Sequence, residues 1–222
     1  MFIYQFKELP LIFIFNEKCA CTTIKNIIND IDKLYDNDEI KDEKKRFFLA
    51  HNNPNAMFQN VTINNILKNK THHVLFFMRN PYHRFLSGYS KIRYKSRILQ
   101  RIDKSKKPED CLQLINNYNI DVDEWGKIIS NIQHKNIEYH FKPQTFNLEK
   151  IFNYKKLTLY DIEQLSNLNE YVKEHFDIDL HCNIHEKYDL KKSKPCQETI
   201  DSVYEYYKKD FELLHYDKEF KL

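Results

Sequence analysis

Residues 11–25 read LIFIFNEKCACTTIK, and this stretch decides the fold. Its first five residues are all apolar, and a short continuous apolar run is typical of a strand buried on both faces. From Thr22 to about Leu34, isoleucines recur at helical spacing, which predicts an amphipathic helix. A buried strand, a short loop and a helix begin a β-α-β unit, so the stretch predicts a parallel sheet covered by helices.

The same order of elements recurs along the chain. Residues 74–78 form a second apolar run, and Pro81 then opens a segment expected to be a helix reaching Tyr94, since proline favours a first helical turn. Apolar periodicity predicts a further strand at 156–160 and helices at 62–69, 121–132, 161–176 and 197–214. Two of these helices have capping boxes, formed by Asp121 with Glu124 and by Asp161 with Gln164. The predicted fold class is therefore α/β, with a central parallel sheet flanked by helices.

The composition favours one soluble domain. With 222 residues, 41% of them hydrophobic, the chain can build one full core, so a single domain over residues 1–222 is expected. A net charge of +3 is mildly basic and suits an anionic ligand. No apolar run of about 20 residues and no signal peptide is seen, so no transmembrane segment is expected. The five cysteines form no evident disulfide framework, which favours reduced thiols and a cytoplasmic location.

The loop between the first strand and the first helix carries groups suited to an anion. In open α/β sheets, ligands bind beyond the carboxyl ends of the strands, where a helix start offers unpaired N–H groups. The loop adds lysine charges, threonine hydroxyls and small side chains, contributed by Lys18, Cys19, Ala20, Cys21, Thr22, Thr23 and Lys25. The Walker pattern of ATP- and GTP-using enzymes is absent. The alternative interpretation is a simple strand-to-helix turn capped by threonine.

A second candidate site follows the second strand, where residues 78–89 read MRNPYHRFLSGY. Arg79 stands at the strand end, and Arg84 and Ser87 lie in the following helix. A planar guanidinium and a hydroxyl together suit a terminal phosphate. The alternative is that both arginines are surface ion-pair partners.

Four motifs in order resemble one known family. They are K-x-A-C-T-x-x-K at 18–25, R-N-P-x-x-R-x-x-S-x-Y at 79–89, H-F-K-P-Q at 140–144 and Y-K-K-D-F-E-L at 207–213. Together they resemble the Golgi-type, PAPS-dependent carbohydrate sulfotransferases (sulfotransferase family 2-like), and the resemblance spans residues 11–216. It implies a P-loop-like fold, a carbohydrate acceptor, no metal, and PAPS (3′-phosphoadenosine 5′-phosphosulfate) as the sulfonate donor.

The resemblance also implies roles for individual residues. Lys18, Thr22 and Thr23 would hold the 5′-phosphosulfate, while Arg79 and Ser87 would hold the 3′-phosphate. The sequence departs from the family at residue 80, where asparagine stands in place of the usual aspartate. The family's membrane anchor and stem are not seen, so we expect a bacterial or viral enzyme acting in the cytoplasm.

Transfer to a sugar hydroxyl needs a positioned base, and histidine suits this because its pKa lies near working pH. His51 lies in the loop after the first helix, in a region where the related uronyl 2-O-sulfotransferases place a catalytic histidine. We therefore expect His51 to be the base and His140 to position the acceptor, although the two roles could be exchanged. The alternative is that both are capped loop histidines.

The sequence also allows other classes of function besides sulfonate transfer. Residues 79–101 are rich in Arg, Lys and Tyr, as in proteins that bind single-stranded nucleic acid, but no standard motif is present. A catalytically inactive scaffold is disfavoured by the presence of Lys18, Thr22, Arg79 and Ser87. A metal site at His181, Cys182 and His185 lacks a second cluster of matching spacing. The acceptor pocket is expected in the irregular segment 98–118.

Overall fold

The structure is a computed structural model that describes residues 1–6, 8–32, 62–68, 70–92, 100, 102–107, 110–111, 120–177 and 194–221. The chain divides into two compact units, each built from two separate parts of the sequence. The first combines Met1–Met78 with Leu148–Glu186, and the second combines Arg79–Asn147 with Lys187–Leu222. That residues 1–222 act as one domain stays a prediction.

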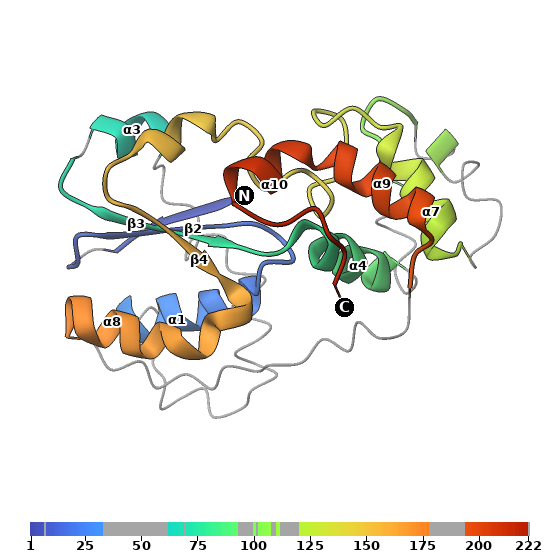
Figure 1. Cartoon of the computed structure of the whole chain (residues 1–222). Coiled ribbons are helices and arrows are strands. Elements are labelled where there is room, and N and C mark those ends of the chain that lie inside the picture. The colour runs from blue at the N-terminus through green and yellow to red at the C-terminus, as the bar shows by residue number, and fades with distance from the viewer. Residues whose placement is uncertain are drawn as a thin grey trace, which may run out of the picture. The chain divides into compact units, whose positions relative to one another are not determined.

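A four-stranded sheet forms the centre of the first unit, in the order β1-β2-β3-β4 (Figure 1). The strands are β1 (Phe2–Gln5), β2 (Leu11–Phe15), β3 (His73–Met78) and β4 (Leu157–Asp161). Strands β2, β3 and β4 run parallel, which confirms the predicted α/β fold. The antiparallel edge strand β1, which pairs Phe2 with Phe15, was not predicted because its four residues are too few to show a distinctive pattern.

Helices cover both faces of this sheet. The helices α1 (Cys21–Asp32) and α8 (Leu168–Phe176) lie on the same face, as Figure 1 shows. The isoleucine stripe of α1 packs there with alternate side chains of β2, since side chains one residue apart point to opposite faces. On the other face lie α3 (Ile63–Lys68) and the 3₁₀ helix η2 (Glu149–Asn153), where the Phe76 and Phe152 rings meet at 5.9 Å.

The second unit is helical and has its own core. Its helices are α4 (Pro81–Ile92), α7 (Val122–Ser130), α9 (Gln197–Tyr206) and α10 (Lys208–Leu213). They pack around large buried aromatic side chains, chiefly Phe85, Trp125, Phe141, Tyr207 and Phe211. None of the helices in the described part of the chain is long and apolar enough to cross a bilayer.

Two predicted helices differ from the structure in detail. The helix predicted at 197–214 is interrupted at Tyr207, whose buried side chain donates a hydrogen bond to the Phe141 carbonyl (2.7 Å). Asp161 caps the segment after β4 as predicted, accepting from the Glu163 amide. That segment, however, begins as the 3₁₀ helix η3 (Ile162–Asn167) with a kink at Gln164, so α8 starts later than predicted.

Candidate functional site

The loop after β2 has an unusual backbone. Lys18 and Ala20 have φ angles of 68° and 49°, a left-handed conformation that side chains other than glycine rarely adopt. The Cys19 amide donates to the Asn16 carbonyl (3.2 Å), and the Cys19 side chain is fully buried. Two strained residues persist only where their surroundings enforce them, and such strain is concentrated at ligand sites.

The helix that follows this loop begins with groups suited to an anion. The first turn of α1 contains no acidic residue, and its leading N–H groups have no acceptor within the helix. Thr22 and Thr23 are half-buried in this turn. The Cys21 thiol donates to the Glu17 carboxylate (3.5 Å), so it serves the loop itself.

The Lys25 ammonium lies over the Phe2 ring, 4.6 Å from its centroid. Because Phe2 pairs with Phe15, the last residue of β2, this charge stays at the carboxyl end of that strand. The loop geometry is therefore consistent with the predicted anion site, and the roles of its individual residues stay predictions.

In the second unit, Asn80 starts α4. Its side-chain Oδ1 accepts from the Tyr82 amide (2.9 Å) and more weakly from the His83 amide (3.4 Å). Its carbonyl accepts from the Arg84 amide (2.9 Å), the first hydrogen bond of the helix. Asparagine and aspartate are equally good helix caps, so the departure from the family pattern at residue 80 preserves the local structure.

Both arginines of this segment are buried, with exposed fractions of 6% for Arg79 and 1% for Arg84. The surface location assumed in the alternative interpretation is therefore wrong for both arginines. Ser87 is also 1% exposed, and its hydroxyl has no hydrogen-bond partner among the described residues. A buried hydroxyl without a partner is costly, and an oxygen of a bound phosphate would satisfy it.

The backbone of Arg79 is held by the glutamine of the H-F-K-P-Q motif. The Arg79 amide donates to Gln144 Oε1 (2.9 Å), and Gln144 Nε2 donates to the Arg79 carbonyl (2.8 Å). The Gln144 backbone is held in turn by Asp210 of the last motif, whose Oδ2 accepts from the Gln144 amide (2.7 Å). Asp210 Oδ1 accepts from both the amide and the hydroxyl of Thr145 (2.9 and 2.7 Å).

Asp210 is completely buried. Burial raises the pKa of its carboxyl, and the hydrogen bonds from Gln144 and Thr145, with the nearby charge of Arg84, act against this rise. Three of the four motifs noted in the sequence are thus joined by hydrogen bonds within one unit.

His140 forms a close pair with Glu138. Its Nδ1 lies 2.9 and 2.8 Å from the two carboxylate oxygens, and its backbone amide donates to Glu138 Oε2 (2.7 Å). Both side chains are buried, and the His140 ring stacks on Tyr139 at 4.5 Å. A carboxylate only accepts hydrogen bonds, so Nδ1 carries a proton that it donates to Glu138. This arrangement can hold a histidine in one tautomer.

One comparison with known proteins identifies the family. The model of the sulfotransferase family matches residues 3–217. The chain belongs to the sulfotransferase family. Searches of the curated proteins and of the solved structures give no significant match. Membership of this family supports sulfonyl transfer in general.

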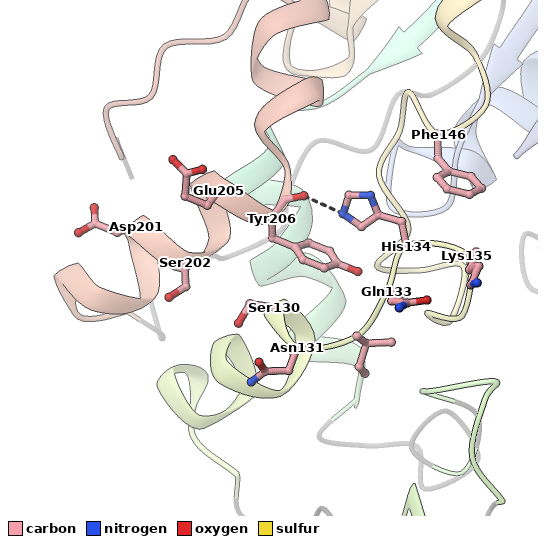
Figure 2. A pocket seen from close by; sticks show the side chains of 11 residues that line it. Ser130, Asn131, Gln133, His134, Lys135, Phe146, Asp201, Ser202, Glu205 and Tyr206 are labelled. Atoms are coloured by element: carbon pink, nitrogen blue, oxygen red, sulfur yellow. Dashed lines mark hydrogen bonds between the residues drawn. The ribbon is translucent and has the colours of Figure 1, made fainter.

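The sulfotransferase also has an open groove of about 1010 Å³ in its second unit (Figure 2). Helix α9 contributes one wall, and the end of α7 with the loop that follows contributes the other. His134 Nε2 donates to the Tyr206 carbonyl across the groove (2.9 Å), and the two rings meet edge-on at 4.5 Å. The remaining lining residues are mostly polar: Ser130, Asn131, Ile132, Gln133, Lys135, Phe146, Asp201, Ser202 and Glu205.

Several predicted site residues fall in parts of the chain that the structure does not describe. His51 lies outside the described residues, as do His181, Cys182, His185 and most of segment 98–118.

The sequence analysis assigned no role to Glu138, which the structure places beside His140. It lies in an irregular segment, and no periodicity links it to His140. Gln144 and Asp210 stood in the family motifs without a predicted role. The structure shows that both form hydrogen bonds that hold backbone segments in place.

Proposed function

We propose that this sulfotransferase moves the sulfonate group of PAPS to a hydroxyl of a carbohydrate. The observation that carries the choice of donor is the buried Ser87 hydroxyl without a described partner, in the helix that begins shortly after the buried Arg79. A 3′-phosphate distinguishes PAPS from ATP, and a guanidinium with a hydroxyl is a suitable pair of ligands for it. Binding of the 5′-phosphosulfate is assigned to the loop at 18–25.

In the proposed reaction, the acceptor oxygen forms a bond to sulfur while the bond from sulfur to the bridging phosphate oxygen breaks. The electron pair of the broken bond stays on the phosphate oxygen, where Lys18 and the start of α1 offset the growing charge. The acceptor proton passes to a histidine. The cationic groups of this loop supply the charge that a metal would otherwise provide, so we expect activity to survive treatment with EDTA.

His51 stays the predicted base, with His140 positioning the acceptor. The Glu138–His140 pair favours a second assignment, because a histidine held in one tautomer by a carboxylate is the usual form of a catalytic base. Alanine substitution distinguishes them: replacing the base should lower turnover by about 10²–10⁴-fold with donor affinity unchanged. Replacing the positioning histidine should mainly raise the KM for the acceptor.

The groove supports a carbohydrate acceptor. Aromatic rings, amides, hydroxyls and carboxylates line it together, and such a mixture can stack on a sugar ring and hydrogen-bond its hydroxyls. Lys135 is outnumbered by Asp201 and Glu205, so the lining favours a neutral sugar over a polyanionic one.

The test has a donor part and an acceptor part. Calorimetry should give micromolar binding of adenosine 3′,5′-bisphosphate and much weaker binding of ATP. Labelled PAPS should then transfer its label to at least one member of a panel of neutral oligosaccharides. Equal binding of the two nucleotides would refute the donor, and transfer only to non-carbohydrate hydroxyls would refute the acceptor class. Tight, salt-sensitive binding of single-stranded DNA without transfer would favour nucleic-acid binding instead.

A further inference from the structure

We propose that Gln144 and Asp210 are positioning residues that direct the Arg79 side chain toward the 3′-phosphate of the donor. The inference rests on the proposed role of Arg79 as a ligand of that phosphate. Gln144 belongs to the motif H-F-K-P-Q and Asp210 to the motif Y-K-K-D-F-E-L. Neither residue is an expected ligand of the donor, so the inference gives each a role.

The need for such residues follows from where Arg79 lies. Strand β3 ends at Met78, whose partner in β4 is Asp161, and Arg79 is the first residue beyond this pairing. A buried backbone segment that leaves a sheet must find other partners for its N–H and C=O groups. The side-chain amide of Gln144 supplies both, because its Oε1 accepts from the Arg79 amide and its Nε2 donates to the Arg79 carbonyl.

Two hydrogen bonds to one peptide segment restrict its φ and ψ angles, and therefore the direction in which its side chain leaves the backbone. Neither bond involves a guanidinium N–H group of Arg79. Gln144 thus fixes the direction of the side chain without occupying its donors. A direction set in advance reduces the entropy that a ligand must overcome on binding.

Asp210 holds Gln144 itself. Its carboxylate accepts from the Gln144 amide at one oxygen and from Thr145 twice at the other. Asp210 stands in the short helix α10, 65 residues from Thr145, so the last motif clamps the turn that carries Gln144. Asp210 therefore holds the backbone of Gln144, and the side chain of Gln144 in turn holds the backbone of Arg79.

The test compares Gln144→Leu, Arg79→Ala and the double variant with the unaltered protein. Leucine retains much of the buried volume but offers no hydrogen bond to the Arg79 backbone. NMR measures the exchange rate of the Arg79 amide hydrogen, which reports its bond to Gln144 without any ligand. Calorimetry measures affinity for adenosine 3′,5′-bisphosphate and for adenosine 5′-monophosphate. Gln197→Leu, at an exposed glutamine of the same unit, is the matched control.

We expect Gln144→Leu to accelerate exchange at Arg79 about tenfold or more, the scale of one lost hydrogen bond. Affinity for the bisphosphate should fall about tenfold, while affinity for the monophosphate should change less than twofold. In the Arg79→Ala background, Gln144→Leu should have no further effect on bisphosphate affinity, because it acts through Arg79. If Gln144→Leu does not fold, Gln144→Met retains the side-chain length, adds no charge and removes both hydrogen bonds to the Arg79 backbone.

Equal losses for both nucleotides, or losses that add in the double variant, would overturn the inference and leave Gln144 a purely structural residue. Unchanged exchange at Arg79 would overturn it as well. If Arg79→Ala bound both nucleotides like the unaltered protein, the proposed phosphate role of Arg79 would fail and the inference with it. Accelerated exchange in Gln144→Leu would then still show that Gln144 holds the Arg79 backbone, so the two failures are distinguishable.

Discussion

Gly88→Ala would add one methyl group within α4, beside the ring of Phe141. The new Cβ would lie 2.5, 2.8 and 3.2 Å from ring atoms Cε1, Cζ and Cδ1. Ordinary carbon–carbon contacts are about 3.5–4.0 Å, so the ring or the helix would have to move by about 1 Å. Gly88 is needed here for close approach between α4 and the H-F-K-P-Q motif.

The Phe141 ring has little room to move. It is completely buried, it packs against Trp125 at 5.2 Å between centroids, and its carbonyl accepts from Tyr207. Overpacking of this kind costs about 1–3 kcal/mol. Replacing glycine inside a helix gains about 0.5–1 kcal/mol. The expected net effect of Gly88→Ala is a loss of about 1 kcal/mol, and at most about 2.5 kcal/mol, in the free energy of unfolding.

Urea unfolding of Gly88→Ala, Phe141→Leu and the double variant measures this effect. Leucine removes the obstructing ring, so the double variant should lose less stability than the sum of the two single losses. Turnover of Gly88→Ala should also fall, because Phe141 adjoins His140. The reasoning is refuted if Gly88→Ala is more stable than the unaltered protein by the amount that helix propensity alone predicts, or if the two losses are additive.

Three further changes test separate parts of the site. Asn80→Ala removes the cap of α4 and should lower the free energy of unfolding by about 0.5–2 kcal/mol, whereas Asn80→Asp should be nearly neutral; a thermal melt of both variants decides. Lys18→Ala should reduce turnover by about 10²-fold or more and weaken donor binding less, and steady-state kinetics with calorimetry would contradict this if turnover stayed within a few-fold. Glu138→Gln replaces one of the two oxygens beside Nδ1 with an NH₂ group that cannot accept, so the preference of the His140 ring for a protonated Nδ1 should weaken; nitrogen-15 shifts of the ring report the tautomer, and an unchanged tautomer would show that the second oxygen does not help to set it.

The local sequence was sufficient to predict the parallel part of the sheet and the helices beside it. Buried strands at 11–15 and 74–78 and the stripe of α1 are visible as runs and periods within a few residues. The helix cap at Asp121 could also be predicted, because its pattern lies within a few consecutive residues. The structure confirms it: the Asp121 side chain accepts from the amides of Asp123 and Glu124. Such patterns record which face of a segment meets the core, and this is a local property.

The break at Tyr207 and the edge strand β1 depended on tertiary contacts. At Tyr207, where the helical pattern is interrupted, the buried hydroxyl donates to the carbonyl of Phe141, 66 residues away. Strand β1 exists because β2 offers it an open edge, with Phe2 placed opposite Phe15. Neither partner can be identified from the few residues around each site, since nothing in a short segment specifies what will pack against it.

The candidate site divides in the same way. The sequence by itself determined which groups carry charge and hydroxyls after each strand, namely the loop at 18–25 and the segment from Arg79 to Ser87. Only the tertiary structure decided that Arg79 and Ser87 are buried, that Gln144 holds the Arg79 backbone and that Asp210 holds Gln144. These hydrogen bonds join residues 65 and 66 positions apart, and they form because folding removes their groups from water and leaves each buried donor in need of an acceptor.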